Sequence, residues 1–203
     1  MKKLTDNVVR HIAPFINDRF LITYTWWERR VNPVTGVVEY HKGIDLATAG
    51  SKPVYSILDG IVHSLGYDSG RGNWIIIKDN NPASPTYGYA TQYMHLANAP
   101  DVSVGDNVVK GQKVGDEGTT GSSSGIHLHL VMQNLNRFNN QWYFSDNESD
   151  YINPCDYMGI DNIKNSWWIY DGTPVPPTPT ITRKKKFPWV IYQNKLRKKF
   201  RNI

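Results

Sequence analysis

The sequence has few of the features that mark disulfide-bonded or membrane-spanning proteins. It holds one cysteine, Cys155, among 203 residues, which excludes an internal disulfide framework and leaves packing or a metal to clamp the fold. It contains no apolar run of roughly 18 residues, so no membrane-spanning helix is expected. The first residues, MKKLTDNVVRHIAPF, carry polar and charged side chains where a signal peptide needs an apolar core. We therefore expect no Sec export signal.

Acidic residues are absent from the last part of the chain. All 18 Asp and Glu precede residue 181, together with 14 of the 23 Lys and Arg, so residues 1–180 carry a net charge of −4. Residues 181–203 carry +9. The basic sequence pI of about 9.2 is thus a property of a tail, and it does not describe the charge of any active site.

The composition and length indicate one soluble globular domain with appended segments. Hydrophobic residues make up 39% of the chain and charged residues 20%, with 7 Trp and 12 Tyr, which excludes a disordered or collagen-like protein. A chain of 203 residues can bury a sizeable core but is short for two full domains.

Short β-rich runs separated by turn residues dominate the chain from Phe20 onward. The runs are RFLITYTWW, KPVYSILDGIVHSLG, NWIIIKD, YGYATQYMHL and IHLHLVMQN, and the separators include NPVTG, DSGRG and GTTGSSSG. The separators are too short for the helices of parallel crossovers. The pattern therefore predicts a mostly β fold built on an antiparallel sheet.

Composition changes divide the chain into four parts. Residues 1–19 show weak helical spacing and predict a short N-terminal helix, and residues 20–172 form the predicted main domain. Residues 173–180, TPVPPTPT, predict an extended Pro/Thr linker. Residues 181–203 form a basic tail with interleaved aromatic residues, which suits an anionic polymer, a membrane surface or an assembly partner. No nucleic-acid fold signature accompanies this charge, so no nucleic acid is expected as a partner.

Four of the six histidines lie in three strand-like segments with an aspartate. His41 and Asp45 are four apart, and His127 and His129 are two apart, so each pair projects to one face of an extended chain. His95 ends a third strand pattern. His11 and His63 lack such neighbours and are interpreted as ordinary core or surface residues.

These residue types suit a catalytic zinc site. Zinc in hydrolases takes three ligands from His and Asp or Glu, and a base and an oxyanion donor are then needed beside it. The four histidines and Asp45 satisfy both requirements. Spacing alone leaves open whether His127 or His129 binds the metal.

Together with the motifs around them, these residues resemble a known family, the lysostaphin-type (LytM-like) zinc metallopeptidases. The resemblance runs from about residue 20 to residue 133 and includes, in the family's order, RVNPVTG, HKGIDLAT, KPVYSILDGIV, DSGRGNWIII, YMHL and VSVGDNVVKGQKVGDEGTTGSSSGIHLHL. The segment TYTWWERR and the long insertion NNPASPTYGYATQ depart from the usual pattern and bear on substrate preference.

The resemblance implies the roles of the candidate residues. His41, Asp45 and His129 match the ligands of one Zn²⁺ ion, while His95 and His127 match the two histidines that handle the proton and the oxyanion. It also implies a groove walled by loops, for which residues 26–27, 68–73 and 119–124 are the candidates.

The function implied is hydrolysis of peptide bonds in the stem or cross-bridge of bacterial peptidoglycan. Without an export signal, such an enzyme resembles phage virion-associated or lytic hydrolases, held in the virion or the host cytoplasm before acting at the wall. The alternative is a non-catalytic structural or activator protein of a phage assembly. The tail would contact other virion proteins or anionic wall polymers, and the sequence leaves the cleaved bond open.

Overall fold

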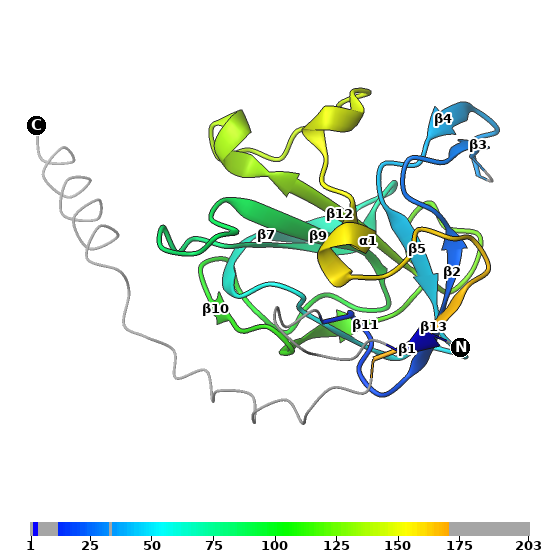
Figure 1. Cartoon of the computed structure of the whole chain (residues 1–203), viewed down its shortest axis with the longest axis horizontal. Helices are drawn as coiled ribbons and strands as arrows, with labels where there is room; N and C mark the ends of the chain where they lie inside the picture. Colours follow the sequence, from blue (N-terminus) through cyan, green and yellow to red (C-terminus); the bar gives the residue numbers. More distant parts are fainter. Residues whose placement is uncertain (1, 4–11, 33, 171–203) are drawn as a thin grey trace, which may run out of the picture.

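A nine-stranded sheet forms the centre of the molecule. In the computed structural model, which describes residues 2–3, 12–32 and 34–170, the strand order is β1-β13-β2-β5-β12-β9-β8-β7-β10 (Figure 1). All neighbours in this sheet pair antiparallel except β1 and β13. Two small sheets, β11-β6 and β3-β4, complete the fold. The predicted mostly β, antiparallel architecture is therefore confirmed.

The strands follow the predicted β-rich runs, and helices are few. The bounds of the strands are β1 Lys2–Lys3, β2 Arg19–Tyr24, β3 Arg29–Val31, β4 Val38–Tyr40, β5 Ile44–Ala47, β6 Pro53–Tyr55, β7 Gly60–Asp68, β8 Gly72–Lys78, β9 Tyr89–Leu96, β10 Asn107–Val108, β11 Lys113–Asp116, β12 Leu128–Asn134 and β13 Trp167–Ile169. The helical turns are η1 Leu135–Phe138, η2 Glu148–Asp150 and α1 Pro154–Met158.

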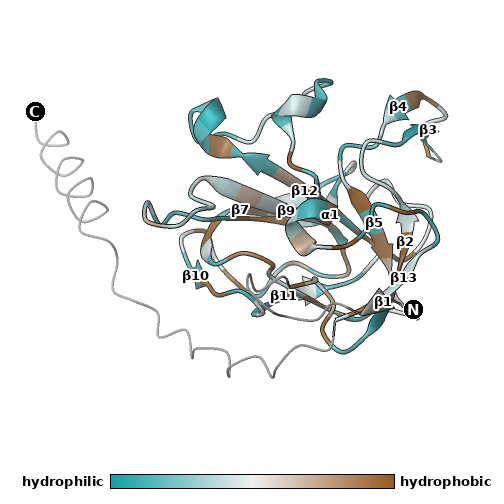
Figure 2. Cartoon of the chain, viewed as in Figure 1, coloured by the Kyte–Doolittle hydropathy of each residue, from teal (hydrophilic) through white to brown (hydrophobic). Residues whose placement is uncertain are grey.

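The two faces of the sheet are covered differently. One face packs on the main core, where side chains such as Phe20, Ile44, Leu46 and Leu130 are fully buried. The other face carries two small apolar clusters, centred on Ile76 and on Met94 with Val131, under the chain that follows β12. Figure 2 shows apolar colour on β5 and also at the tip of the β3–β4 hairpin, where Val37 and Val38 are exposed.

The helix predicted over residues 1–19 is absent from the described residues 12–18, of which 14–18 form bends. The apolar side chains of this stretch, Ile12, Ala13, Phe15 and Ile16, are all buried in the main core instead. Its backbone bonds to other segments, because the carbonyl of Pro14 accepts from Tyr55 N at 2.9 Å and Asn17 N donates to Tyr170 O at 2.8 Å. Tertiary burial of all the apolar side chains thus overrides a weak helical pattern.

The predicted Pro/Thr linker, residues 173–180, and the basic tail, residues 181–203, lie outside the described residues. So does residue 11, one of the two histidines interpreted as ordinary. In the described ranges no helix has the length and apolar character required to cross a membrane.

Two tyrosine hydroxyls hold the buried turn between β6 and β7. The hydroxyl of Tyr93, on β9, accepts a hydrogen bond from Ile57 N at 2.8 Å, and the hydroxyl of Tyr157 donates to Ile57 O at 3.4 Å. Tyr93 is fully buried, and burial raises its pKa to about 12.

We expect Tyr93→Phe to lower the free energy of unfolding by about 1–3 kcal/mol, because it leaves the buried amide of Ile57 without an acceptor. Urea unfolding followed by tryptophan fluorescence measures this loss. Tyr67→Phe is the matched control, since Tyr67 is 66% exposed, and it should change stability by less than about 0.5 kcal/mol. Equal effects of the two variants would contradict the assigned role of the Tyr93 hydroxyl.

Candidate active site

The structure brings His41, Asp45 and His129 together on one face of the sheet. Asp45 Oδ1 lies 3.1 Å from His41 Nε2 and 2.6 Å from His129 Nδ1, and the two nitrogens are 2.9 Å apart. All three side chains are nearly buried. Among the described residues, this is the group whose ligand atoms could hold a metal ion.

Strand register produces this convergence. β5 and β12 pair antiparallel with Asp45 directly opposite His129, so the two side chains project from neighbouring positions on one face. His41 directly follows β4, and its side chain reaches Asp45 and His129. Gly43 permits this approach, because a Cβ at this position would lie 2.5 Å from Leu130 O and 3.0 Å from His129 Nε2. The glycine of the His-x-x-x-Asp element is thus required by close approach of the two segments.

His127 and His129 lie on the same face, as their spacing predicted. His127 Nε2 is 3.7 Å from Asp45 Oδ1, and the intervening Leu128 is fully buried in the main core. His127 directly precedes β12 and forms an isolated bridge with Gly118.

His95 reaches the site through a backbone irregularity. Strand alternation would point His95 away from the face that carries its neighbour Met94. His95 instead has a φ of 62°, and Met94 and His95 together oppose the single residue Trp74 of β8, which makes a β-bulge. The bulge places the ring of His95 4.8 Å from that of His127 and 6.0 Å from that of His129.

Backbone carbonyls fix three of the four imidazoles. The Nδ1 atoms of His41, His95 and His127 lie 2.9, 2.8 and 2.8 Å from the carbonyl oxygens of residues 25, 120 and 125. A carbonyl can only accept, so each Nδ1 carries a proton, and in the neutral form of the ring the lone pair is on Nε2.

Burial and the Asp45 charge set the protonation states. Burial lowers the pKa of His129 to about 3, against the raising effect of the Asp45 carboxylate. Burial alone would raise the pKa of Asp45, but the His41 and His129 imidazoles hold it well below its ordinary value. Burial and the neighbouring His127 also lower the pKa of His95. At neutral pH the site therefore combines a carboxylate with a neutral His129 and a neutral His95.

The second oxygen of Asp45 is held by Arg30. Asp45 Oδ2 accepts from Arg30 Nη1 at 3.2 Å, and the same guanidinium pairs with Glu39 at 3.2 Å and stacks on Tyr24 at 4.7 Å. Arg30 therefore leaves Oδ1 as the oxygen that faces the histidines.

The donor set fits a divalent cation of the zinc type. His41 Nε2 has a lone pair in the neutral form of its ring, His129 is neutral and Asp45 is ionised, so three electron-pair donors converge. Two imidazoles and one carboxylate are the ligand set of a catalytic zinc ion.

Comparison with known proteins agrees with this geometry. Residues 39–143, just over half of the chain, match the sequence profile of Peptidase family M23. The chain belongs to this family. The DD-endopeptidase ShyC of Vibrio cholerae is 36% identical over 101 residues, which cover 50% of this chain and 22% of ShyC. The chain spans about a quarter of the length of the curated relatives it matches.

Two solved structures of catalytic domains resemble the fold. The catalytic domain of lysostaphin from Staphylococcus simulans matches with a TM-score of 0.51 and 28% identity, over 70% of this chain and 93% of that domain. A mutant catalytic domain of the prophage-encoded M23 protein EnpA from Enterococcus faecalis matches with a TM-score of 0.50 and 26% identity, over 70% of this chain and 94% of that domain. The resemblance to the lysostaphin type, stated from the motifs, is thus confirmed.

Loops of this M23 domain wall a groove over the cluster. The groove is lined by the β3–β4 hairpin on one side and by residues 122–127 on another, with Met94 and Val131 on its floor and Phe144 and Tyr151 beside them. Two of the three predicted wall segments therefore contribute, residues 119–124 through the serines and residues 68–73 through Gly70.

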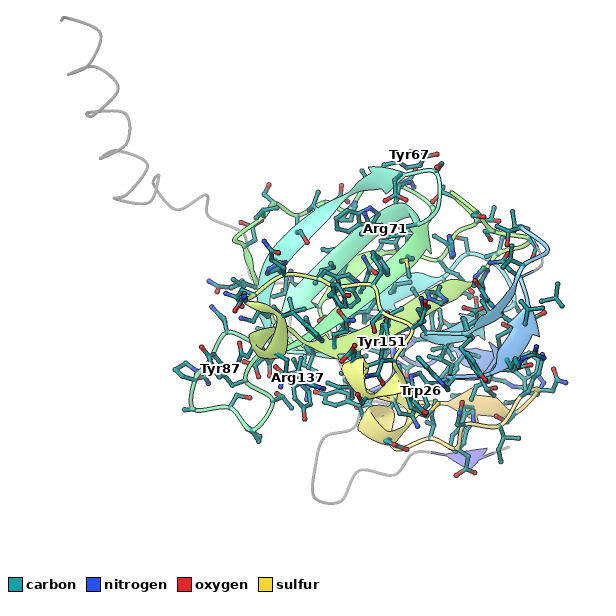
Figure 3. The ribbon with its side chains drawn as sticks, turned by 90° about the horizontal axis from the view of Figure 1, so that it is seen from above. Trp26, Tyr67, Arg71, Tyr87, Arg137 and Tyr151 are labelled. Atoms are coloured by element: carbon teal, nitrogen blue, oxygen red, sulfur yellow. The ribbon has the colours of Figure 1, made fainter. Side chains whose placement is uncertain are left out.

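The third predicted wall, residues 26–27, does not line the groove. Trp27 stacks on Tyr40 with ring centroids 5.6 Å apart and touches Tyr151 at 5.8 Å, so it lies behind two aromatic residues that do line it. Figure 3 shows Trp26 and Tyr151 near each other on this side of the molecule. A pair of tryptophans in a loop gives no sequence signal that distinguishes a rim from the layer beneath it.

Sequence reasoning also missed Arg30 and the carbonyls that orient the histidines. Arg30 was part of a matched motif, but nothing in the motif indicates that it contacts Asp45. The carbonyls of residues 25, 120 and 125 carry no sequence signal, because every residue has a carbonyl. His63, interpreted as ordinary, lies outside the group and bonds Asn140 O at 2.8 Å.

A buried carboxyl group supports the loop that presents His127. Glu117 is fully buried and accepts from Thr48 N at 3.0 Å, next to the Gly118–His127 bridge. Burial raises its pKa above the ordinary value of 4.5. The folded protein therefore binds this proton more tightly than the unfolded chain does.

We expect the stability of the wild type, relative to Glu117→Gln, to fall as pH rises from about 4.5 through the raised pKa of the folded state, because the folded carboxyl must then ionise in a buried place. Urea unfolding of both proteins at several pH values measures the difference. The exposed Glu148→Gln controls for loss of one negative charge. A stability difference that stays constant with pH would overturn this assignment.

Proposed function

We propose that this chain is a zinc-dependent endopeptidase that hydrolyses peptide bonds in the stem or cross-bridge of bacterial peptidoglycan. The observation that carries the proposal is the convergence of His41, Asp45 and His129 in a groove, with His95 and His127 at their side. Membership of family M23 and the similarity to DD-endopeptidases support it. One zinc ion would be held by His41 Nε2, Asp45 Oδ1 and His129 Nδ1.

Each side chain has a distinct task in this proposal. The zinc ion supplies Lewis acidity toward the scissile carbonyl and the attacking water. His95 and His127 present Nε2 atoms toward the groove, with Nδ1 fixed by a carbonyl. The neutral His95 can accept a proton from the attacking water and then give the same proton to the leaving amine, while His127, when it carries a proton on Nε2, can donate a hydrogen bond to the developing oxyanion. Arg30 keeps the Asp45 carboxylate in place.

A phage origin is part of the proposal. The similarity to a prophage-encoded M23 protein supports it, as does a tail of net charge +9 that suits anionic wall polymers or a virion partner. The enzyme would then act at the cell wall after delivery with a virion or after release during lysis. The non-catalytic alternative is disfavoured because none of the five proposed residues is replaced.

Zinc content tests the ligand set. The wild type should retain about one zinc per chain after dialysis, and His129→Ala should retain much less, because two ligands do not complete the site. Mass spectrometry of the metal in purified protein measures this ratio. His63→Ala is the matched control and should keep its zinc. Full zinc occupancy in His129→Ala would sink the assignment of that ligand.

Activity separated from zinc content tests the other two histidines. His95→Ala and His127→Ala should keep zinc but release muropeptides from purified cell walls about 10²–10⁴-fold more slowly, the range of general acid–base catalysis. Mass spectrometry of the released fragments gives the rate and the cleaved bond. His63→Ala again serves as the control. Retained activity in both variants would show that neither histidine handles the proton.

A further inference from the structure

Arg71 lies beside the proposed catalytic pair and is rigidly held. Its carbonyl accepts from His95 N at 2.9 Å, and its amide donates to Asp68 Oδ1 at 2.8 Å. The next residue, Gly72, has a φ of 66° and leaves no room for a Cβ against Thr120, whose carbonyl orients His95. The backbone of Arg71 is thereby fixed relative to the reacting centre.

The guanidinium of Arg71 is fixed as well. Its Cζ lies 3.8 Å from the centroid of the Trp74 ring and 5.7 Å from that of Phe144. Its Nε donates to Asp68 Oδ2 at 2.6 Å, and the same oxygen accepts from Trp74 Nε1 at 3.1 Å. Stacking and this ion pair together hold the plane of the group at low entropic cost on binding.

The fixed guanidinium adjoins the groove with unused donors. Two neighbours of Arg71 line the groove, Gly70 in the chain and Phe144, whose ring centroid is 5.7 Å from Cζ, and the Arg71 side chain is 26% exposed. Its Nη1 and Nη2 have no hydrogen-bond acceptor among the residues that the structure describes. Other cations at the groove differ, because Arg30 pairs with Asp45 and Glu39, and Lys42 pairs with Asp146 at 2.7 Å.

We infer that Arg71 binds a carboxylate of the substrate and makes this enzyme selective for anionic stem peptides over uncharged cross-bridges such as oligoglycine. Two parallel N–H groups of a guanidinium match the two oxygens of a carboxylate, and a partly desolvated site strengthens that pair. The inference rests on the proposed function and adds the chemical class of the peptide. The aromatic flanks, Trp74 and Phe144, would exclude water from one side of the pair.

The test compares substrates that differ in a single charge. Cross-linked stem peptides are prepared with each free carboxylate converted in turn to its amide, together with an oligoglycine-linked peptide. We expect one of the amidations to lower kcat/KM of the wild type by about tenfold or more, the size of a lost charge-assisted hydrogen bond. The oligoglycine-linked peptide should be the poorer substrate.

Two substitutions locate the effect at Arg71. In Arg71→Gln the ratio of kcat/KM for the carboxylate form to that for the amide form should fall to about one. In Arg71→Lys the ratio should lie between this value and that of the wild type, since an ammonium ion keeps the charge but lacks the two parallel N–H groups of a guanidinium. Arg137→Gln is the matched control and should keep the wild-type ratio. Figure 3 shows Arg137 far from Arg71, toward the opposite end of the sheet.

The outcomes are distinguishable. A wild type that cleaves no peptide overturns both the proposed function and this inference. A wild type that cleaves every peptide with similar kcat/KM overturns the inference alone, and so does an unchanged ratio in Arg71→Gln. Because the wild-type ratio and Arg71→Lys are measured independently, the inference stays testable if Arg71→Gln fails to fold.

Discussion

The carboxylate of Asp45 is the group on which the site depends. One of its oxygens faces His41, His127 and His129 within 3.7 Å, and the other is bonded to Arg30. An ionised carboxylate that is almost fully buried is costly unless such partners surround it. The pairing of β5 with β12 supplies the position, and the β3–β4 hairpin supplies the arginine. Loss of Arg30 would leave one oxygen of this buried carboxylate without its partner.

The strand that carries His95 meets two incompatible demands. With regular strand alternation the side chain of Met94 would point to the groove floor and that of His95 to the opposite face of the sheet. In the structure both side chains line the groove. The bulge at Met94–His95 resolves this by placing His95 in a left-handed conformation, which costs about 1–3 kcal/mol for a residue other than glycine. Hydrogen bonds from His95 to the carbonyls of Arg71 and Thr120 offset part of that cost.

Patterns with a fixed period could be predicted from the sequence, and features set by tertiary contact could not. The His127–Leu128–His129 alternation fixed which side chains share a face, because strand period allows no other arrangement. The assignment of metal and non-metal histidines came from resemblance, because both members of the pair satisfy the spacing. The bends at residues 14–18 could not be foreseen, since Ile12 and Phe15 suit a helix face as well as a closely packed bend.

The groove and the tail have separate electrostatics. The described charges closest to the groove are largely cancelled in pairs, Arg30 with Asp45 and Glu39, and Lys42 with Asp146. The net positive charge of the tail therefore does not extend to the groove. Arg71 differs in that Asp68 neutralises its charge from one side only, through Nε, and leaves the outer fork of the guanidinium unbonded. A guanidinium with two free, parallel N–H groups matches a carboxylate in one orientation. Such a contact distinguishes substrates with a carboxylate from substrates without one.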